Sequence, residues 1–170
     1  MSKRPTFAVL LPTTAYILRL EPPPARRFIQ GNILFHDPAL WLLFKCIIIF
    51  NHWASVPVAL GSDFNPNAHC LSMPLVMHLA CVNLRLTMNE ALVAATINAA
   101  GTTSPNWMND SLLTPISFFP GSLNKSASHG SLEVGKVGDM LILDAPKWEH
   151  LIYQLGDPPI EKVIKRGKVV

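Results

Sequence analysis

The chain of 170 residues has room for one domain, or for one domain and a small second piece. Apolar residues make up 49% of it and charged residues only 15%, a composition that supports a sizeable core and excludes global disorder. The formal net charge of +3 is small and evenly spread, so the charge pattern does not indicate nucleic acid as a partner.

The three cysteines, Cys46, Cys70 and Cys81, are odd in number and have no CxxC spacing. This pattern argues against a disulfide scaffold and against a structural zinc knuckle. The basic N-terminus is followed by an apolar stretch that is too short for the core of a signal peptide. We therefore expect a reducing compartment and a cytoplasmic protein.

Two short buried strands are predicted in the first 60 residues, at residues 7–11 and at residues 56–60. Between them, residues 13–20 predict a loop with one helical turn, which a run of three prolines closes. Residues 39–50 form an apolar block of about a dozen residues, whereas a membrane span takes about 20. We interpret this block as a buried segment, with a membrane anchor as the alternative.

Helical signals follow a polar loop in the middle of the chain. Residues 73–83 have apolar side chains at helical spacing. Thr87 and Glu90 have the spacing of a capping box, in which each side chain satisfies a backbone amide of the other. Residues 91–100 are small and strongly helix-forming, and Gly101 predicts the end of that helix.

The last third of the chain changes character twice. Residues 102–128 are dominated by Ser, Thr, Asn, Pro and Gly, which is typical of a loop. Residues 130–143 predict a glycine-rich turn and then an apolar strand. Residues 160–170 alternate and carry a Lys-Arg-Gly-Lys turn, which predicts a β-hairpin. We expect the helices of residues 73–101 to pack against these C-terminal strands, with residues 27–55 and 102–128 poorly fixed.

Asp63 is the strongest candidate for a catalytic residue. It directly follows the predicted strand at residues 56–60 and begins a loop rich in Asn, Pro and His. In a (β/α)8 barrel the carboxyl ends of the strands carry the catalytic groups, so an acid at this place has a ready role. An aspartate after a strand is also an ordinary turn residue, and its position alone leaves both interpretations open.

Residues 10–16 (LLPTTAY) and 58–67 (VALGSDFNPN) resemble the last two barrel strands of the imidazolonepropionases, a family of metal-dependent amidohydrolases. Its following helices, its closing sandwich strand and its C-terminal segment resemble residues 75–101, 130–143 and 148–153.

The resemblance implies an α/β fold: the last strands and helices of a (β/α)8 amidohydrolase barrel, with strands of a small β-sandwich domain. The expected units are a barrel strand and loop (1–26), an unmatched insertion (27–55), the last barrel strand with site loop and helices (56–101), an unmatched loop (102–128), and sandwich strands with the C-terminal segment (129–170).

The family's site carries over to four residues. The resemblance implies that Asp63 is a ligand of one zinc or iron ion and accepts a proton from the metal-bound water. That water attacks the ring amide carbon of 4-imidazolone-5-propanoate and gives N-formimidoyl-L-glutamate, a step of histidine degradation. Asn65, Asn67 and Ala68 align with positions that bind substrate or product.

The chain departs from the family in its other metal ligands. None of its six histidines forms the HxH pair, and a full barrel takes roughly 250 residues. His78 is expected to be a packed helix residue, and His69 lies beside the site loop. A catalytic zinc usually has three protein ligands, so we expect the chain alone to be inactive.

Three functional hypotheses stay open at this point. The first is a hydrolase of a small cyclic amide, carried by Asp63. The second is a non-catalytic truncated isoform that associates with the full-length subunit, in which case the unmatched segments reflect altered splicing. The third is a small membrane-associated protein anchored by residues 39–50. A homo-oligomer is compatible with each.

Overall fold

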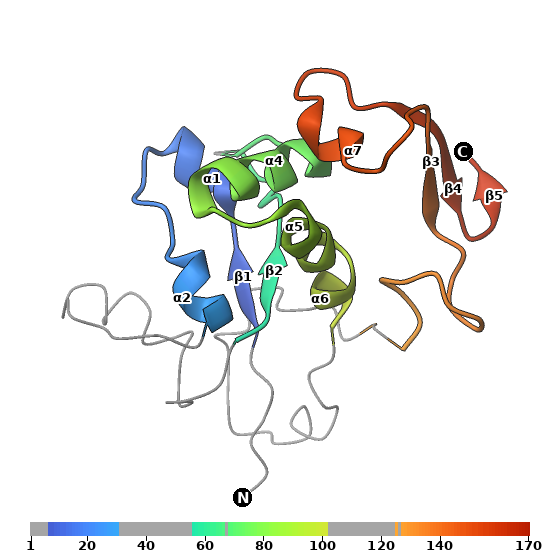
Figure 1. The fold of residues 1–170 in the computed structure, drawn as a ribbon, viewed down its shortest axis with the longest axis horizontal. Coiled ribbons are helices and arrows are strands. Elements are labelled where there is room, and N and C mark those ends of the chain that lie inside the picture. The colour runs from blue at the N-terminus through green and yellow to red at the C-terminus, as the bar shows by residue number, and fades with distance from the viewer. Residues whose placement is uncertain (1–6, 31–55, 67, 102–124, 126) are drawn as a thin grey trace, which may run out of the picture.

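A computed structural model describes residues 7–30, 56–66, 68–101, 125 and 127–170 of the protein (Figure 1). In chain order the elements are β1 (Ala8–Leu10), α1 (Pro12–Ile17), α2 (Ala25–Gln30), β2 (Val58–Leu60), α4 (Met73–Leu84), α5 (Met88–Ala95), α6 (Ile97–Ala100), β3 (Met140–Leu143), α7 (His150–Tyr153), β4 (Ile160–Lys165) and β5 (Lys168–Val169).

The two strands predicted in the first 60 residues are confirmed, and they lie side by side in parallel. β1 pairs with β2 from Ala8 opposite Val58 to Leu10 opposite Leu60. A parallel pair needs a crossover connection, and the chain between these strands carries helices α1 and α2. In Figure 1 both strands run toward α1 and α4, which lie at their carboxyl ends.

The helix predicted at residues 73–83 is confirmed as α4. The Ser72 hydroxyl caps its first turn by accepting from the amide of Leu75, and Arg85 ends it in the left-handed conformation. The predicted capping box at the start of α5 is also confirmed. There the amide of Glu90 donates to the Thr87 hydroxyl, and the Glu90 carboxylate accepts from the amide of Thr87.

The helix predicted to run from residue 91 to residue 100 is broken in the structure. It ends as α5 at Ala95, and α6 starts again at Ile97. Thr96 between them has φ −117° and ψ −90°, and its hydroxyl donates to the carbonyl of Leu92 at 2.7 Å. Such a bond offers the backbone an alternative to the regular helix ladder, which explains the break. Gly101 follows α6, as predicted.

Residues 12–30 are more helical than predicted. α1 takes up six residues and starts with a proline, whose fixed φ suits the first helical position. α2 runs across the expected boundary at residues 26 and 27, and Phe28 is only 1% exposed. The first residues of the segment expected to be poorly fixed therefore belong to the core.

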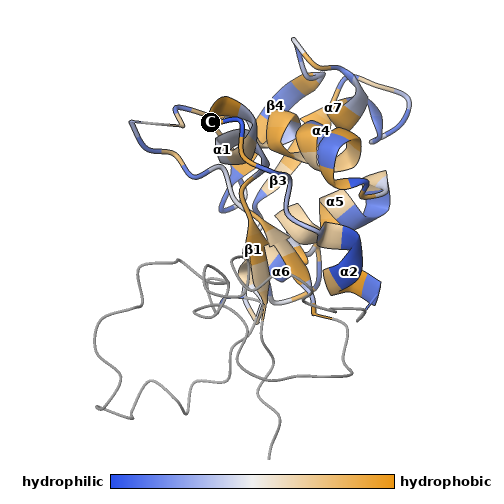
Figure 2. Cartoon of the chain, turned by 90° about the vertical axis from the view of Figure 1, so that its left-hand side faces the viewer, coloured by the Kyte–Doolittle hydropathy of each residue, from blue (hydrophilic) through white to orange (hydrophobic). Residues whose placement is uncertain are grey.

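The core lies between the parallel strands and the helices around them. It joins apolar side chains of β1, β2, α2, α4 and α5 to Leu151 and Ile152 of α7. Figure 2 shows strand β1 and the inner sides of the neighbouring helices in the colour of hydrophobic residues. The helices of residues 73–101 were expected to pack against the C-terminal strands. Among the described strands, α5 and α6 contact β2, and Leu143 of β3 and Ile160 of β4 also pack against the core.

The C-terminal strands form a separate antiparallel sheet in the order β3-β4-β5. This confirms the predicted apolar strand and the predicted hairpin. The described chain is thus a mixed α/β structure, whereas the barrel and the sandwich stay predictions. No helix within the described residues is long and apolar enough to cross a membrane, and the apolar block at residues 39–50 lies outside those residues.

Candidate functional site

Asp63 lies just past the carboxyl edge of the parallel sheet, where the sequence predicted it. Because β1 and β2 are parallel and in register, the residues that follow them meet at one edge. The Thr13 hydroxyl donates to the carbonyl of Ser62 at 3.1 Å. The Thr14 hydroxyl donates to Oδ2 of Asp63 at 2.8 Å. Two neighbouring threonines after β1 thus hold two neighbouring residues after β2.

The backbone at Asp63 has an uncommon conformation. Its φ is +51°, in the left-handed region that only a few per cent of non-glycine residues adopt and that Asp and Asn tolerate best. The side-chain amide of Asn65 donates to the carbonyl of Asp63 at 2.6 Å. The Asp63 side chain is half-buried. Its carboxylate is therefore held by Thr14 of α1, and its main chain is held by its own loop.

The loop that follows is closed by hydrogen bonds of its own. The Asn65 side-chain oxygen accepts from the amide of Ala68 at 3.3 Å, and the two residues also pair through their main chains. Ala68 is fully buried. Asn67 lies outside the described residues. In the structure Asn65 and Ala68 shape the turn next to Asp63, and their predicted contacts with substrate or product stay predictions.

Two histidines lie near this loop in very different settings. His69 is exposed, and its ring centroid is 4.8 Å from that of the exposed Phe64. His78 of α4 is half-buried, and its Nδ1 lies 3.1 Å from the carbonyl oxygen of Ile152 in α7. His78 therefore joins two helices of the core, in line with the structural role predicted for it.

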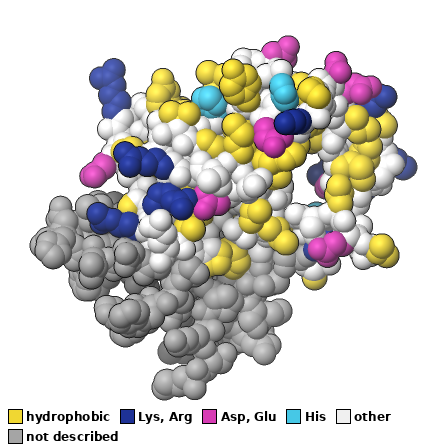
Figure 3. All heavy atoms as spheres, in the orientation of Figure 1, with side chains coloured by type: hydrophobic (Ala, Val, Ile, Leu, Met, Phe, Trp, Pro, Cys, Tyr) yellow, Lys and Arg dark blue, Asp and Glu magenta, His cyan; other side chains and the backbone are white. Residues whose placement is uncertain are grey.

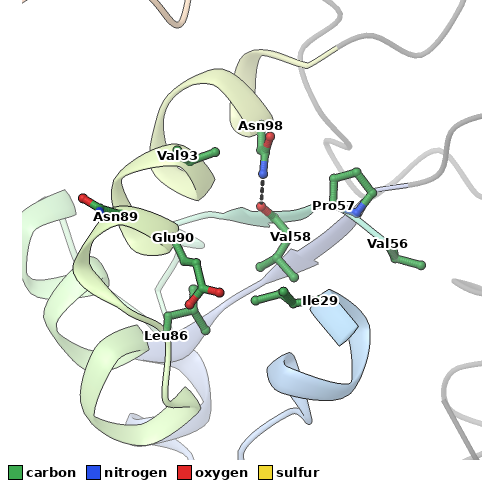
Figure 4. Close-up of a pocket in the computed structure, with 9 residues that line it drawn as sticks. All are labelled: Ile29, Val56, Pro57, Val58, Leu86, Asn89, Glu90, Val93 and Asn98. Carbon is green, nitrogen blue, oxygen red and sulfur yellow. Dashed lines mark hydrogen bonds between the residues drawn. The ribbon is translucent and has the colours of Figure 1, made fainter. Parts of the chain in front are cut away.

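A cavity of about 310 Å³ lies beside the start of β2 (Figure 4). Asp63, in contrast, follows the end of that strand. The lining of the cavity is mainly apolar and comes from the start of β2 and the two residues before it, from Leu86, and from α2, α5 and α6: Ile29, Val56, Pro57, Val58, Leu86, Asn89, Glu90, Val93 and Asn98. The Asn98 side chain donates to the carbonyl of Val58 at 2.8 Å. Asp63 is not among the lining residues, so this cavity and the candidate site are separate features.

An ion pair beside this cavity joins α2 to α5. The Arg26 guanidinium lies 2.6 Å from a carboxylate oxygen of Glu90. Burial by itself raises the pKa of Glu90, but hydrogen bonds from the Thr87 amide and from Arg26 outweigh it, so the net pKa lies below its usual value. This ion pair is partly exposed and links α2 to α5.

At this sheet edge the described residues offer one carboxylate, that of Asp63, as a metal ligand. Among the described residues no three His, Cys, Asp or Glu side chains lie together in a way that could hold a metal ion. Zinc in catalytic sites usually takes three protein ligands, so Asp63 in its described surroundings does not make a complete metal site. The zinc or iron that the resemblance implies stays a prediction.

Sequence reasoning had overlooked Thr13 and Thr14. They directly follow one predicted strand, just as Ser62 and Asp63 directly follow the other. If the two strands are assumed to lie side by side in parallel, Thr13 and Thr14 come to the same sheet edge as Ser62 and Asp63. The order of residues in the sequence could therefore have indicated this contact.

Relatives that share one name match the whole chain. It is 49% identical over 172 aligned residues to a probable imidazolonepropionase of Nematostella vectensis and 53% identical over 170 to that of Dictyostelium discoideum, each match covering 100% of this chain and 30% of the relative. The human protein of the same name is 47% identical over 165 residues, which cover 96% of this chain and 29% of that protein. No family model matches. The chain thus spans about 30% of the length of these relatives.

The fold of this chain is similar to part of a solved structure. E. coli guanine deaminase, which has an amidohydrolase fold, superposes with a TM-score of 0.52 at 17% identity. The superposition covers 97% of this chain and 33% of the deaminase. At this identity the likeness concerns the fold alone. The sequence resemblance to imidazolonepropionases is confirmed by the curated relatives.

Proposed function

Since the chain is related over its whole length to the imidazolonepropionases, we propose that it is the aspartate-bearing part of such an enzyme. The reaction would be hydrolysis of 4-imidazolone-5-propanoate to N-formimidoyl-L-glutamate in histidine degradation. One observation carries the proposal: Asp63 stands half-buried at the carboxyl edge of two parallel strands, with Oδ2 held by Thr14. We further propose that these strands belong to a partial (β/α)8 barrel, that β3–β5 belong to the small sandwich, and that the protein is cytoplasmic.

Asp63 has the chemistry that this hydrolysis needs. A carboxylate beside the ring can accept a proton from the water that attacks the amide carbon. The carbon–nitrogen bond of the ring then breaks, and the proton ends on the leaving nitrogen. Asn65, Asn67 and Ala68 would bind substrate or product along the adjoining loop.

The described residues supply only one of the ligands that a zinc or iron ion would need, so we derive no step through the metal. For the same reason we propose that the chain by itself does not turn over this substrate. A zinc titration by calorimetry tests this. Stoichiometric micromolar binding that Asp63→Asn destroys would contradict the proposal.

A complementation assay tests the function itself. The chain is mixed with the part of the Dictyostelium relative that it does not match, and imidazolone hydrolysis is followed together with metal content. We expect turnover only in the mixture, and a loss of roughly 10²- to 10⁴-fold with Asp63→Asn. Asp139→Asn, just before β3, where the carboxylate accepts from the amide of Arg166, is the matched control and should keep turnover. Equal turnover with Asp63→Asn would overturn the assignment.

A second candidate function is a non-catalytic isoform that associates with the full-length subunit. The observation that favours it is the exposed apolar surface of the β3–β5 sheet, where Leu141 and Val169 are 45% and 65% exposed. Figure 3 shows hydrophobic side chains on the surface in this part of the molecule. Exposed strands of this kind readily pair with another chain. Co-purification of the tagged chain with a full-length relative, lost on Leu141→Lys, would support it; failure to co-purify would remove it.

A further inference from the structure

The two threonines after β1 hold their partners in different ways. Thr13 is 2% exposed, and its hydroxyl donates to a main-chain carbonyl, that of Ser62. A buried carbonyl needs such a donor, so this bond belongs to the packing of the strand ends. The hydroxyl of Thr14 donates to a side chain, the carboxylate of Asp63. Only the second bond acts on an atom that could take part in a reaction.

The Thr14 donor is well fixed by its surroundings. Pro12 just before the pair is fully buried, and its ring locks the backbone φ. Thr13 next to it is buried as well. The branched side chain of a threonine has few χ1 choices. The hydroxyl of Thr14, in the first turn of α1, therefore has few orientations, and it meets a carboxylate 49 residues away in the sequence.

A carboxylate without such a partner would sample several orientations. The χ1 of an aspartate has three staggered wells, and its terminal torsion is broad. The bond to Oδ2 at 2.8 Å favours one orientation of the Asp63 side chain and uses one acceptor site of that oxygen. Among the described residues no hydrogen bond reaches Oδ1, so this oxygen is the freer one to meet a reacting group.

We propose that Thr14 is a positioning residue for Asp63, which fixes the carboxylate through Oδ2 so that Oδ1 is the oxygen presented for the chemistry. The part of this statement that concerns chemistry rests on the proposed function. The fixed orientation itself is a property of this chain and can be tested without turnover.

The test measures the orientation of the Asp63 side chain in the full chain by nuclear magnetic resonance. The three-bond couplings between Hα and the two Hβ protons report which χ1 rotamers are populated. In the unaltered chain we expect the couplings of a single rotamer. Thr14→Val keeps the shape and removes the donor, and we expect its couplings to fall to the average over the staggered rotamers. Thr14→Ser restores the hydroxyl and should restore the single rotamer.

Thr13→Val is the matched control, because it removes a hydroxyl one residue away that bonds the backbone instead. It should lower the thermal midpoint of unfolding and leave the Asp63 couplings as they are. Averaged couplings in the unaltered chain would overturn the proposal even if no variant folds. So would a single rotamer in Thr14→Val, or equal loosening in Thr13→Val.

Failure of this proposal is distinguishable from failure of the proposed function. If Asp63→Asn has no effect in the complementation assay, the function fails whatever the couplings show. If Asp63→Asn abolishes turnover but Thr14→Val leaves the rotamer unchanged, the function stands and Thr14 has only a structural role.

Discussion

Each of the two sheets among the described residues contains a fully apolar strand, and these two strands, β2 and β3, have opposite burial. All three residues of β2 (VAL) are buried, whereas β3 (MLIL) has three exposed residues and one half-buried residue. The difference is in what covers them. Helices α2 and α5 and the neighbouring strand β1 contact β2, while β3 is in contact mainly with β4 of its own sheet. An apolar run predicts a strand, and only its neighbours decide whether the strand is buried.

The comparison also places the candidate site. Asp63 and Thr14 follow the covered strands, where packing can hold a side chain in one geometry. The β3–β5 sheet offers the opposite surroundings, with apolar side chains in contact with solvent. Mutations in the two regions should therefore differ in their effect on stability, and the difference can be measured.

The largest effect is expected in the covered region. Phe28→Ala empties a site in α2 that is 1% exposed and should lower the free energy of unfolding by about 3–5 kcal/mol. Val163→Ala in β4, where the side chain is 38% exposed, should lower it by about 0.5 kcal/mol. Urea titration of both variants measures the contrast. Equal, small losses would mean that α2 does not belong to the core.

A smaller effect is expected where the two regions meet. A Cβ on Gly130, with φ +91°, would lie 2.8 Å from Cβ of Ala100 and 3.0 Å from Cα of Ile97 in α6. Gly135 has the same φ, but a Cβ added there would meet no atom within 4 Å.

We expect Gly130→Ala to cost about 2–4 kcal/mol, because a clash adds to the left-handed backbone penalty. Gly135→Ala should cost only the backbone part, about 1–2 kcal/mol. Thermal unfolding of the pair measures the steric part as their difference. No difference would mean that residue 130 does not pack against α6.

How much of this could be predicted from the sequence depends on how local the signal is. The strands at residues 7–11 and 56–60, helix α4 and the capping box at Thr87 were predicted because their patterns lie within a few residues. The break at Thr96 was missed because helix propensity does not predict the hydrogen bond from the Thr96 hydroxyl to the carbonyl of Leu92.

The candidate site shows the same limit. Asp63 was found from its place after a strand and from the family resemblance. Its partner Thr14 lies 49 residues away, and no local pattern connects the two. α2 was missed because a proline run precedes it and because residues 27–55 were interpreted as an insertion, although Phe28 packs in the core and α2 contacts β2.

The smallest effect on stability is expected from removing one carboxylate in each region, Glu90 in the covered region and Asp139 beside the β3–β5 sheet. In Glu90 the hydrogen bonds from Thr87 and Arg26 outweigh burial and lower the pKa. The pKa of Glu90 is lower in the folded chain than its ordinary value of 4.5 in the unfolded chain. The carboxylate therefore stabilises the fold fully at pH values above 4.5, and this contribution is lost as the pH falls through the pKa of the folded state. Glu90→Gln should cost about 1 kcal/mol or less at neutral pH, since the pair is part-exposed, and flatten the loss of stability as the pH falls below 4.5.

In Asp139 the hydrogen bond from the Arg166 amide, and then that from Lys165, hold the pKa of the carboxyl below its usual value, so its contribution is also lost on acidification. This carboxylate ties a turn of the exposed sheet. Asp139→Asn should therefore speed amide hydrogen exchange in β4 and β5 and leave global unfolding unchanged, because local openings of a weakly covered sheet do not require the core to open. If Asp139→Asn lowers global stability as much as Glu90→Gln does, the two regions unfold as one unit, and the contrast between a covered and an uncovered sheet has no energetic counterpart.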